Sequence, residues 1–417
     1  MEIKSVRGTK DILPDEIEKW QNIEHISRQI FSLYGFKEIR TPIIENANLF
    51  KRSIGETTDI VEKEMYTFQD IKARTISLRP EATASIVRAY IENNLDKKEG
   101  FVKLYYIGPM FRAERPQKGR QRQFHQLGVE AIGSYSPFLD TEIILLLNRL
   151  LKNLSITNFV LKINSLGCSE DRKNFTVVLK ENLKKHLKGL CEDCNSRFNR
   201  NVLRILDCKK ESCKKIVRTM PKITDNLCKE CVSHFNLFKD MLKEHSVNFT
   251  EDKTLVRGLD YYTKTVFEVI HPLLGAQDAI GAGGRYDNLI ELFGGPRIGA
   301  IGFALGIERL FLACDLDKIT YKDTKPCIYF ASIGEPCYRE AFSLAEKLRS
   351  NGVRAEVDYE GKSLKAQMKE ADKLNVSTVA ILGEDELKKG EIILRDMKTS
   401  SQKSIKIEKL LDAILLA

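Results

Sequence analysis

Residues 110–133 read MFRAERPQKGRQRQFHQLGVEAIG, in which two β-rich runs, MFRAE and FHQLGVEAI, flank the basic loop RPQKGRQR. Side chains alternate along a strand, so Gln126, Gly128 and Glu130 should share one face, and Gly128 leaves room there for a small ligand. Arg112 on the first run points away from both of its neighbours, toward whatever the sheet holds. The stretch therefore predicts a strand, a basic loop and a returning strand beside a ligand site.

Similar short runs occur on both sides of this stretch. They are IRTPII from Ile39, MYTF from Met65, TISLR from Thr75, KLYYI from Lys103, FVLKI from Phe159, VNFT from Val247, TVFEVI from Thr265 and IGAIGFA from Ile298. Helices are expected at residues 15–34, 81–92 and 138–154; in the first, apolar residues recur every three or four positions. Strands that follow one another with tight loops predict an α+β fold, an antiparallel sheet flanked by helices.

Two changes of pattern divide the chain. Residues 170–250 are basic and cysteine-rich and interrupt the strands, which predicts a helical insertion. The cluster DKITYKDTKP, which ends at Pro326, marks the second change. Beyond it strands and helices alternate strictly, so residues 326–417 are expected to form a separate α/β domain with a mixed sheet, and residues 1–325 the main domain.

Composition excludes several classes of protein. The chain has 417 residues, of which 42% are hydrophobic and 30% charged, as in ordinary globular proteins. No window offers the roughly 18 uncharged apolar residues that would span a bilayer. The amino-terminal stretch MEIKSVRGTKDILPDE lacks the apolar core of a secretory signal, so a cytoplasmic location is expected.

The net charge of +9 is concentrated in the insertion. Residues 171–250 carry 18 basic and 10 acidic residues. Such a patch attracts polyanions, and counterion release makes the binding sensitive to salt. The alternative is a lysine-rich, solvated helical face, which is commoner in proteins at large.

Six of the ten cysteines lie in the same segment. They are Cys191, Cys194, Cys208, Cys213, Cys228 and Cys231. The two C-x-x-C pairs are typical of structural zinc, with Cys191, Cys194, Cys228 and Cys231 as the candidate ligands. Six thiols for four positions leave the ligand set open by spacing alone, and reduced, half-buried thiols remain the alternative.

Several common catalytic motifs are absent. The sequence has no G-x-x-x-x-G-K-[ST], and GAGGRYD from Gly281 fails the G-x-G-x-x-G spacing at its third glycine. It has neither H-E-x-x-H nor G-x-S-x-G. These absences exclude the usual phosphate-loop, zinc-protease and serine-hydrolase interpretations.

Three segments resemble the signature of class II aminoacyl-tRNA synthetases: GFKEIRTPIIE from Gly35, the stretch from Phe111 quoted above, and GAIGFALGIERL from Gly299. Two others, LVRGLDYYTKTVFEV from Leu255 and LRPEATAS from Leu78, are similar to the histidyl-tRNA synthetase family of that class. The resemblance covers essentially the whole chain. It implies a class II catalytic core, a helical insertion and a C-terminal anticodon-binding domain.

The resemblance implies that a histidine carboxylate attacks the α-phosphate of ATP. This nucleophile is already ionised, so catalysis should consist of alignment and of cations that stabilise charge on the phosphate. Arg112 and Arg257 are expected at the α-phosphate, Arg309 at the γ-phosphate and Glu114 beside the adenine, with Mg²⁺ bridging the leaving phosphates. Each arginine taken alone would more often be a surface side chain or an ion-pair partner.

The resemblance also implies a pocket for L-histidine. Glu81, Thr83 and Gln126 would lie near the α-ammonium group. Glu130 and Tyr262 would bind the imidazole, with Tyr261 beside them. The other expected contributors are Ala82, Arg112 and Arg257, with Gly283, Gly284 and Tyr286 shaping the floor.

The basic loop is expected to hold the acceptor end of tRNA. Its candidate residues are Arg115, Gln117, Lys118, Arg120 and Arg122. The insertion would lie along the acceptor stem, where A-form RNA is recognised by backbone and shape. The resemblance implies tRNA(His), ATP and L-histidine as partners and a homodimer formed through GFKEIRTPIIE, with no membrane or DNA partner.

Two rival functions remain at this point. One is the catalytically silent paralogue of these enzymes, which regulates the first enzyme of histidine biosynthesis; it typically lacks the terminal domain and degrades the arginine motifs. The chain retains Arg112, Arg257, Arg309 and the whole tail. The other is a zinc-organised RNA-binding protein whose core is only a scaffold.

Overall fold

The computed structural model describes residues 3–117, 119–316 and 327–415, which form two compact units. The division between the units falls between residues 316 and 327. The predicted boundary between residues 325 and 326 lies in that gap, outside the described residues. Each unit is described by itself.

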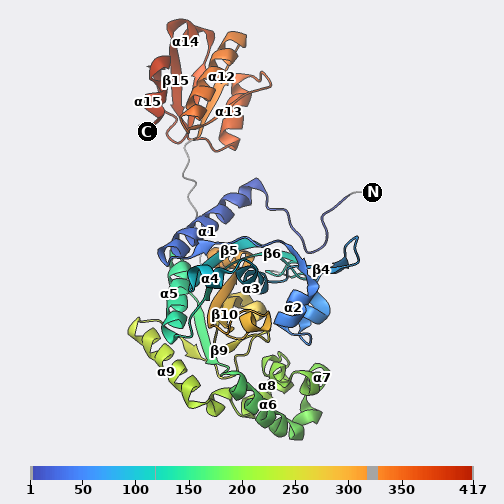
Figure 1. Ribbon diagram of the computed structural model, residues 1–417. Helices are drawn as coiled ribbons and strands as arrows, with labels where there is room; N and C mark the ends of the chain where they lie inside the picture. Colours follow the sequence, from blue (N-terminus) through green and yellow to red (C-terminus); the bar gives the residue numbers. More distant parts are fainter. Residues whose placement is uncertain (1–2, 118, 317–326, 416–417) are drawn as a thin grey trace. The chain divides into compact units, whose positions relative to one another are not determined.

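An eight-stranded sheet forms the centre of the first unit (Figure 1). Its strands, in spatial order, are β1 Lys37–Glu38, β5 Val102–Phe111, β6 Gln123–Ile132, β11 Ala300–Gly306, β10 Ala279–Arg285, β9 Thr263–Ile270, β7 Val160–Ser165 and β8 Thr250–Glu251. The two edge pairs, β1 with β5 and β7 with β8, are parallel, and all other neighbours are antiparallel. The predicted antiparallel sheet is confirmed.

The pairing of β5 with β6 sets the two faces of the sheet. Along β6, Leu127, Val129 and Ala131 are fully buried in one large apolar core. The alternate residues project from the other face, as the alternation in sequence predicts. In this register Tyr106 on β5 lies opposite Gly128 on β6.

Helices cover the apolar face. The core there contains residues of α1 Pro14–Leu33, α5 Pro137–Asn153, α9 Lys229–Glu244 and α11 Ile307–Leu316. On α1, Trp20, Ile23, Ile30 and Phe31 are buried, which is the predicted apolar stripe. This packing leaves the opposite face of the sheet for the site.

A second layer borders that opposite face. It comprises the small sheet β2 Ile44–Asn46, β4 Thr75–Leu78 and β3 Thr67–Gln69, with α2 Ala47–Ile54, η1 Ile60–Glu64, α3 Thr83–Glu92, α4 Leu95–Glu99 and α10 Leu289–Leu292. The short helix η5 Pro272–Gln277 joins β9 to β10 and contacts α11 instead. The helix α3 packs residues Ile86, Val87 and Tyr90 into a core that it shares with β5. This core places the amino terminus of α3 beside the middle of the sheet.

The insertion is helical, as predicted. Its elements are α6 Ser169–Leu183, η2 Lys184–Gly189, α7 Glu192–Arg200, η3 Val202–Asp207, α8 Glu211–Thr219, η4 Ile223–Asn226 and α9. Phe175 and Leu179 of α6 share one apolar cluster with Leu255 and Tyr262 of the main domain. The insertion is therefore packed into the first unit rather than tethered to it.

The second unit has a mixed five-stranded sheet. Its strands in spatial order are β13 Arg354–Val357, β12 Cys327–Ser332, β14 Thr378–Leu382, β15 Glu391–Asp396 and β16 Gln402–Lys406, with helices α12 Glu335–Ser350, α13 Leu364–Lys373, α14 Glu384–Lys389, η6 Ile407–Lys409 and α15 Leu410–Leu415. The pairs β12–β13 and β12–β14 are parallel, and the other two are antiparallel. The strict alternation of strands and helices in the sequence predicted this arrangement.

Three local predictions were wrong. The run IRTPII is not one strand, because Pro42, which lacks an N–H donor, separates β1 from β2. The run VNFT contributes only Thr250 to β8. The strand β5 ends at Phe111, so Arg112 lies just past its end.

No helix in the described part of the chain is long and apolar enough to cross a membrane.

Candidate active site

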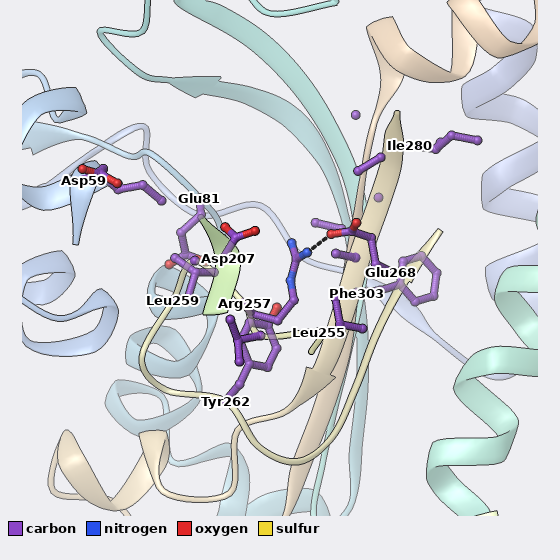
Figure 2. Close-up of a pocket in the computed structure, with 18 of the residues that line it drawn as sticks. Asp59, Glu81, Asp207, Leu255, Arg257, Leu259, Tyr262, Glu268, Ile280 and Phe303 are labelled. Carbon is purple, nitrogen blue, oxygen red and sulfur yellow. Dashed lines mark hydrogen bonds and ion pairs between the residues drawn. The ribbon is translucent and has the colours of Figure 1, made fainter. Parts of the chain in front are cut away.

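A cavity of about 1100 Å³ lies over the polar face of the central sheet. Its floor is formed by strands β6, β9, β10 and β11. Part of its wall is formed by residues 255–262 and by the η3 region of the insertion. Figure 2 shows this wall, with Asp207 of η3 and Leu255 lying around Arg257. The volume slightly exceeds the roughly 300–1,000 Å³ that is usual for sites of single small ligands, so the cavity has room for a nucleotide together with a small second substrate.

Three arginines from distant segments line this cavity. Arg112 follows β5, Arg257 precedes β9, and Arg309 lies on α11. Sequence analysis predicted all three as site residues, and the structure brings them together. Their permanent charges make this part of the cavity suited to an anion with several oxygens.

Each arginine is held by the surrounding fold. Arg112 Nε donates to the carbonyl oxygen of Pro80 at 2.9 Å, and its guanidinium lies 5.2 Å from the ring centroid of Phe124. Arg309 donates to the carbonyl oxygen of Ala279. These contacts fix the guanidinium groups before a ligand arrives, which lowers the entropic cost of binding.

Arg257 is held in a different way. It forms an ion pair with Glu268 of β9, drawn as the dashed line in Figure 2. Its side chain is only 22% exposed, and its Nε is buried without a hydrogen-bond partner among the described residues. Arg257 therefore retains a donor that a ligand oxygen can satisfy.

Glu114 links two cations at the cavity wall. Its carboxylate lies 2.8 Å from Arg120 Nη1 and 3.8 Å from Arg112 Nη1. The neighbouring carboxyl of Glu64 also lines the cavity, and burial raises its pKa above the ordinary value. The predicted role of Glu114 beside an adenine stays a prediction; the contact that the structure shows is with the arginines.

Two buried carboxyl groups lie near the amino terminus of α3. Glu81 accepts hydrogen bonds from the backbone N–H groups of Thr83 at 2.7 Å and Ala84 at 2.9 Å. Glu130 accepts from the hydroxyls of Thr83 and Tyr286, each at 2.6 Å. Thr83 thus joins the two predicted acids into one cluster.

Burial dominates the ionisation of this cluster. It raises the pKa of Glu130 to about 8, despite the two hydroxyl donors that favour the charged form. It also raises the pKa of Glu81, against the two backbone N–H donors. A cationic ligand bound beside these groups would favour their charged forms, so the pocket is suited to an ammonium or a ring N–H donor.

Tyrosines surround the carboxyl cluster. The ring centroids of Tyr261 and Tyr262 are 4.8 Å apart, and those of Tyr261 and Tyr286 are 5.9 Å apart. Burial raises the pKa of Tyr262 to about 12, so its hydroxyl stays a neutral donor and acceptor. Gln126 Oε1 is buried without a hydrogen-bond partner among the described residues, and the residue lines the cavity. The pocket therefore combines flat rings with polar groups that a small ring-bearing ligand can pair.

Glycine provides the space between these groups. A Cβ atom on Gly128 would lie 2.4 Å from the carbonyl oxygen of Phe303 and 2.6 Å from the hydroxyl of Tyr106. A Cβ atom on Gly302 would lie 2.0 Å from a carboxylate oxygen of Glu130. Side chains at either position would displace the residues that form the pocket.

Several predicted residues do not line the cavity. Ala82 is buried beside it, and Gly283 and Gly284 are packed within the sheet. Of the described residues of the basic loop, Gly119, Arg120 and Gln121 line the cavity, whereas Arg115, Gln117 and Arg122 do not. Arg122 instead contacts the amino-terminal segment through its backbone N–H, which donates to the carbonyl oxygen of Gly8 at 2.6 Å. Lys118 lies outside the described residues. The roles of Arg115 and Gln117 at an RNA end stay predictions.

Sequence reasoning missed several lining residues, among them Glu268, Tyr106 and Arg204. Glu268 is a charged residue in the otherwise apolar run TVFEVI, a signal that could have been used. Tyr106 has only the alternation of β5 as a signal. Arg204 comes from the insertion, and no local pattern indicates that it reaches the site; its Nη1 donates to the carbonyl oxygen of Arg257 at 3.2 Å.

The predicted set of four cysteine ligands is wrong. The structure separates the two C-x-x-C pairs into two clusters: Cys191 and Cys194 lie with Cys208 and Cys213, while Cys228 and Cys231 lie with Cys168 and Asp171. Spacing along the chain could not distinguish these sets, because the fold of the insertion chooses the partners.

Comparison with known proteins agrees with this geometry. The histidyl-tRNA synthetase family model matches residues 8–310, and the anticodon-binding domain model matches residues 328–415. The chain belongs to the histidyl-tRNA synthetase family. It is 51% identical to the histidine–tRNA ligase of Desulforamulus reducens over 97% of both chains. It is 49% identical to that of Thermodesulfovibrio yellowstonii over 99% of this chain and 98% of the relative.

The fold agrees as well. The crystal structure of apo histidyl-tRNA synthetase from S. aureus matches 99% of this chain and 100% of its own with a TM-score of 0.85 at 36% sequence identity. The class II synthetase fold and the C-terminal anticodon-binding domain are therefore confirmed, and the reading as a synthetase is favoured over the regulatory paralogue.

In this synthetase, Glu130→Gln should remove a pH-dependent loss of stability. The unfolded chain releases the Glu130 proton near the ordinary value of about 4.5, whereas the folded protein holds it until about pH 8. Between these values the folded state binds more protons, so its stability falls as pH rises. Glutamine keeps the shape of the side chain and has no charge. The stability of the variant relative to wild type should therefore rise from pH 5 to pH 8, by at most about 4 kcal/mol.

Thermal unfolding of both proteins at pH 5, 6.5 and 8 measures this effect. Glu92→Gln, a change at an exposed side chain, controls for the loss of one carboxyl group. A difference between wild type and Glu130→Gln that stays constant with pH would show that Glu130 ionises normally in the free enzyme.

Proposed function

We propose that this synthetase activates L-histidine with ATP, forming histidyl-adenylate and pyrophosphate, and then transfers the histidyl group to the 3′ end of tRNA(His). The observation that carries the proposal is the convergence of Arg112, Arg257 and Arg309 on one cavity that also contains the Glu81–Glu130–tyrosine pocket. The first group of residues suits a triphosphate and the second a small cationic amino acid. The relatives from Desulforamulus reducens and Thermodesulfovibrio yellowstonii are histidine–tRNA ligases, a name that denotes this reaction.

The first step needs no general base, because the histidine carboxylate is ionised before it attacks the α-phosphate. A bond forms between the carboxylate oxygen and phosphorus, and the bond to the leaving pyrophosphate breaks. Arg112 and Arg257 offset the charge that accumulates on the α-phosphate oxygens, and Arg309 holds the γ-phosphate. Because these side chains are held by Pro80, Glu268 and Ala279, they need little rearrangement at the transition state.

Mg²⁺ is the expected companion of ATP in this site. Bound to the phosphates, it neutralises their charge and orients the leaving group. The carboxylates of Glu64 and Glu114 line the same cavity and supply the oxygen donors that Mg²⁺ prefers, so the residues fit the ion. They would hold it directly or through its water shell.

Histidine is selected by paired polar groups. Glu81 and Gln126 bind the α-ammonium group, and Glu130 and Tyr262 bind the imidazole. A pocket that hydrogen-bonds both ring nitrogens discriminates strongly against apolar analogues, because its buried polar groups would remain unpaired. Exclusion of larger side chains follows from the close packing around Gly128 and Gly302.

Recognition of tRNA uses three parts of the chain. The basic loop 115–122 binds the acceptor end, the insertion lies along the acceptor stem, and the C-terminal domain binds the anticodon. The insertion's excess of basic residues supports the first two contacts, since phosphate charge dominates RNA affinity. We further propose that the enzyme is a cytoplasmic homodimer, with the exposed Ile43 and Ile44 in the dimer contact.

The decisive test is ATP–pyrophosphate exchange with each of the twenty amino acids in turn. We expect exchange with histidine only, followed by charging of tRNA(His). Absence of exchange with every amino acid would favour a regulatory paralogue or an RNA-binding scaffold. Exchange with another amino acid would overturn the assignment of the Glu81–Glu130 pocket.

A further inference from the structure

Four cysteines of the insertion converge at one point. Cys191 precedes α7, Cys194 lies in its first turn, Cys208 follows η3, and Cys213 lies on α8. Their sulfur atoms all lie within 4.8 Å of one another, and the Sγ atoms of Cys191 and Cys208 are 3.9 Å apart. A disulfide requires about 2.05 Å, whereas four thiolates at about 2.3 Å from a central zinc are about 3.8 Å apart.

The backbone supports a metal site as well. The N–H of Cys191 donates to the sulfur of Cys213 at 3.3 Å. Hydrogen bonds to ligand atoms orient them and stabilise their charge in metal sites. Cys194 and Cys213 are fully buried and Cys208 is 8% exposed, so the cluster is closed to solvent on most sides, as in structural zinc sites.

The local charge fits a tetrathiolate complex. Zinc with four thiolates carries a net charge of about −2, which must be offset when it is partly buried. Lysines follow two of the ligands directly in sequence: Lys209 and Lys210 after Cys208, and Lys214 and Lys215 after Cys213. Part of the positive charge of the insertion is therefore adjacent in sequence to two of the candidate ligands.

We propose that Cys191, Cys194, Cys208 and Cys213 bind one structural Zn²⁺ as four thiolates. Binding releases the four thiol protons, and no redox step is involved. The proposal concerns the insertion and is independent of the reaction assigned to the cavity.

The metal would stabilise a segment of the insertion that contacts residues 255–262 of the cavity wall. Two residues in the sequence between Cys194 and Cys208 make these contacts. Asn201 donates to the carboxylate of Asp260 at 3.0 Å, and Arg204 donates to the backbone carbonyl of Arg257. Segments as short as α7 and η3 gain little stability from their own helical bonds. A zinc that joins both to α8 would hold these contacts in place.

The second cluster is a matched comparison. There Asp171 already accepts hydrogen bonds from the backbone N–H groups of Cys228 at 2.9 Å and Cys168 at 3.2 Å, as part of the cap of α6. Cys228 is exposed. This carboxylate is engaged in holding the chain, so we place the zinc at the four-cysteine cluster alone.

The first experiment measures zinc by plasma mass spectrometry in the full chain purified without chelators. We expect about one zinc per chain in the wild type and in Cys228→Ser, and a fall of about tenfold in Cys208→Ser. Wild type with no zinc, or zinc lost from Cys228→Ser and kept by Cys208→Ser, would overturn the proposal. Two zinc ions in the wild type, of which Cys208→Ser loses one, would support this site.

The second experiment needs no variant, in case Cys208→Ser does not fold. X-ray absorption at the zinc edge of the wild-type chain should show a shell of four sulfur atoms at about 2.3 Å. A shell that contains oxygen would locate the metal at the Asp171 cluster instead. Formation of a disulfide between Cys191 and Cys208 in the protein as purified under reducing conditions would also exclude the site.

Discussion

Arg257→Ala should lower the rate of histidine-dependent ATP–pyrophosphate exchange by about 10²–10³-fold, or about 2.7–4 kcal/mol of transition-state stabilisation. The side chain lies in the cavity, is held by Glu268, and has a buried Nε without a partner among the described residues (Figure 2). A fixed cation interacts most strongly with the α-phosphate when negative charge accumulates on it. We therefore expect a loss in kcat, with little change in histidine affinity.

Three comparisons separate this role from a structural one. Arg257→Lys keeps the charge and loses the planar fork, so its rate should fall between those of wild type and Arg257→Ala. Arg74→Ala, at a side chain that is 70% exposed outside the cavity, should retain full exchange. If Arg257 only held Glu268 in place, Glu268→Ala would lose as much as Arg257→Ala, and the double variant would lose no more. Exchange by Arg257→Ala near the wild-type rate would remove this residue from the chemistry.

Local patterns predicted three of the four strands that form the cavity floor, β6, β9 and β11, but not β10. The alternation along Gln126, Gly128 and Glu130 correctly predicted one face of β6. The run GAGGRYD was not predicted to be a strand, because glycines ordinarily indicate turns. In the structure it belongs to β10, where a Cβ atom on Gly283 would lie 2.2 Å from the carbonyl oxygen of Gly302. Close contact between neighbouring strands explains these glycines, and it is visible only after the strands have paired.

The same limit applies to the site. Residues inside distinctive segments, such as Arg112 and Arg309, could be selected before the fold was known. Arg204 could not, because its contact with Arg257 joins positions more than fifty residues apart through the packing of the insertion. The cysteines show the limit most clearly: the C-x-x-C spacing indicated metal ligation, but the turn between η3 and α8 decides which sulfurs meet.

Removing residues 327–417 should leave histidine-dependent pyrophosphate exchange essentially unchanged while tRNA charging falls by at least about 10²-fold in kcat/KM. All the described residues that line the cavity with the three arginines belong to the first unit. In the part of the chain that the structure describes, the hydrophobic clusters of the first unit and those of the second share no residues. Each unit therefore has a core of its own, and the shortened chain should fold.

The expected loss arises from multivalent binding. Once a tRNA is bound at its acceptor end or at its anticodon, binding at the other end is intramolecular and occurs at a high effective concentration. Without the C-terminal domain, the tRNA loses this gain in affinity. Adding the separate fragment 327–417 should not restore charging, because the covalent link supplies the effective concentration. Comparing exchange and charging rates for the full and shortened chains, with circular dichroism to verify folding, tests the division of labour. If exchange fell by the same factor as charging, activation would depend on the C-terminal domain, and its assignment to anticodon binding alone would be wrong.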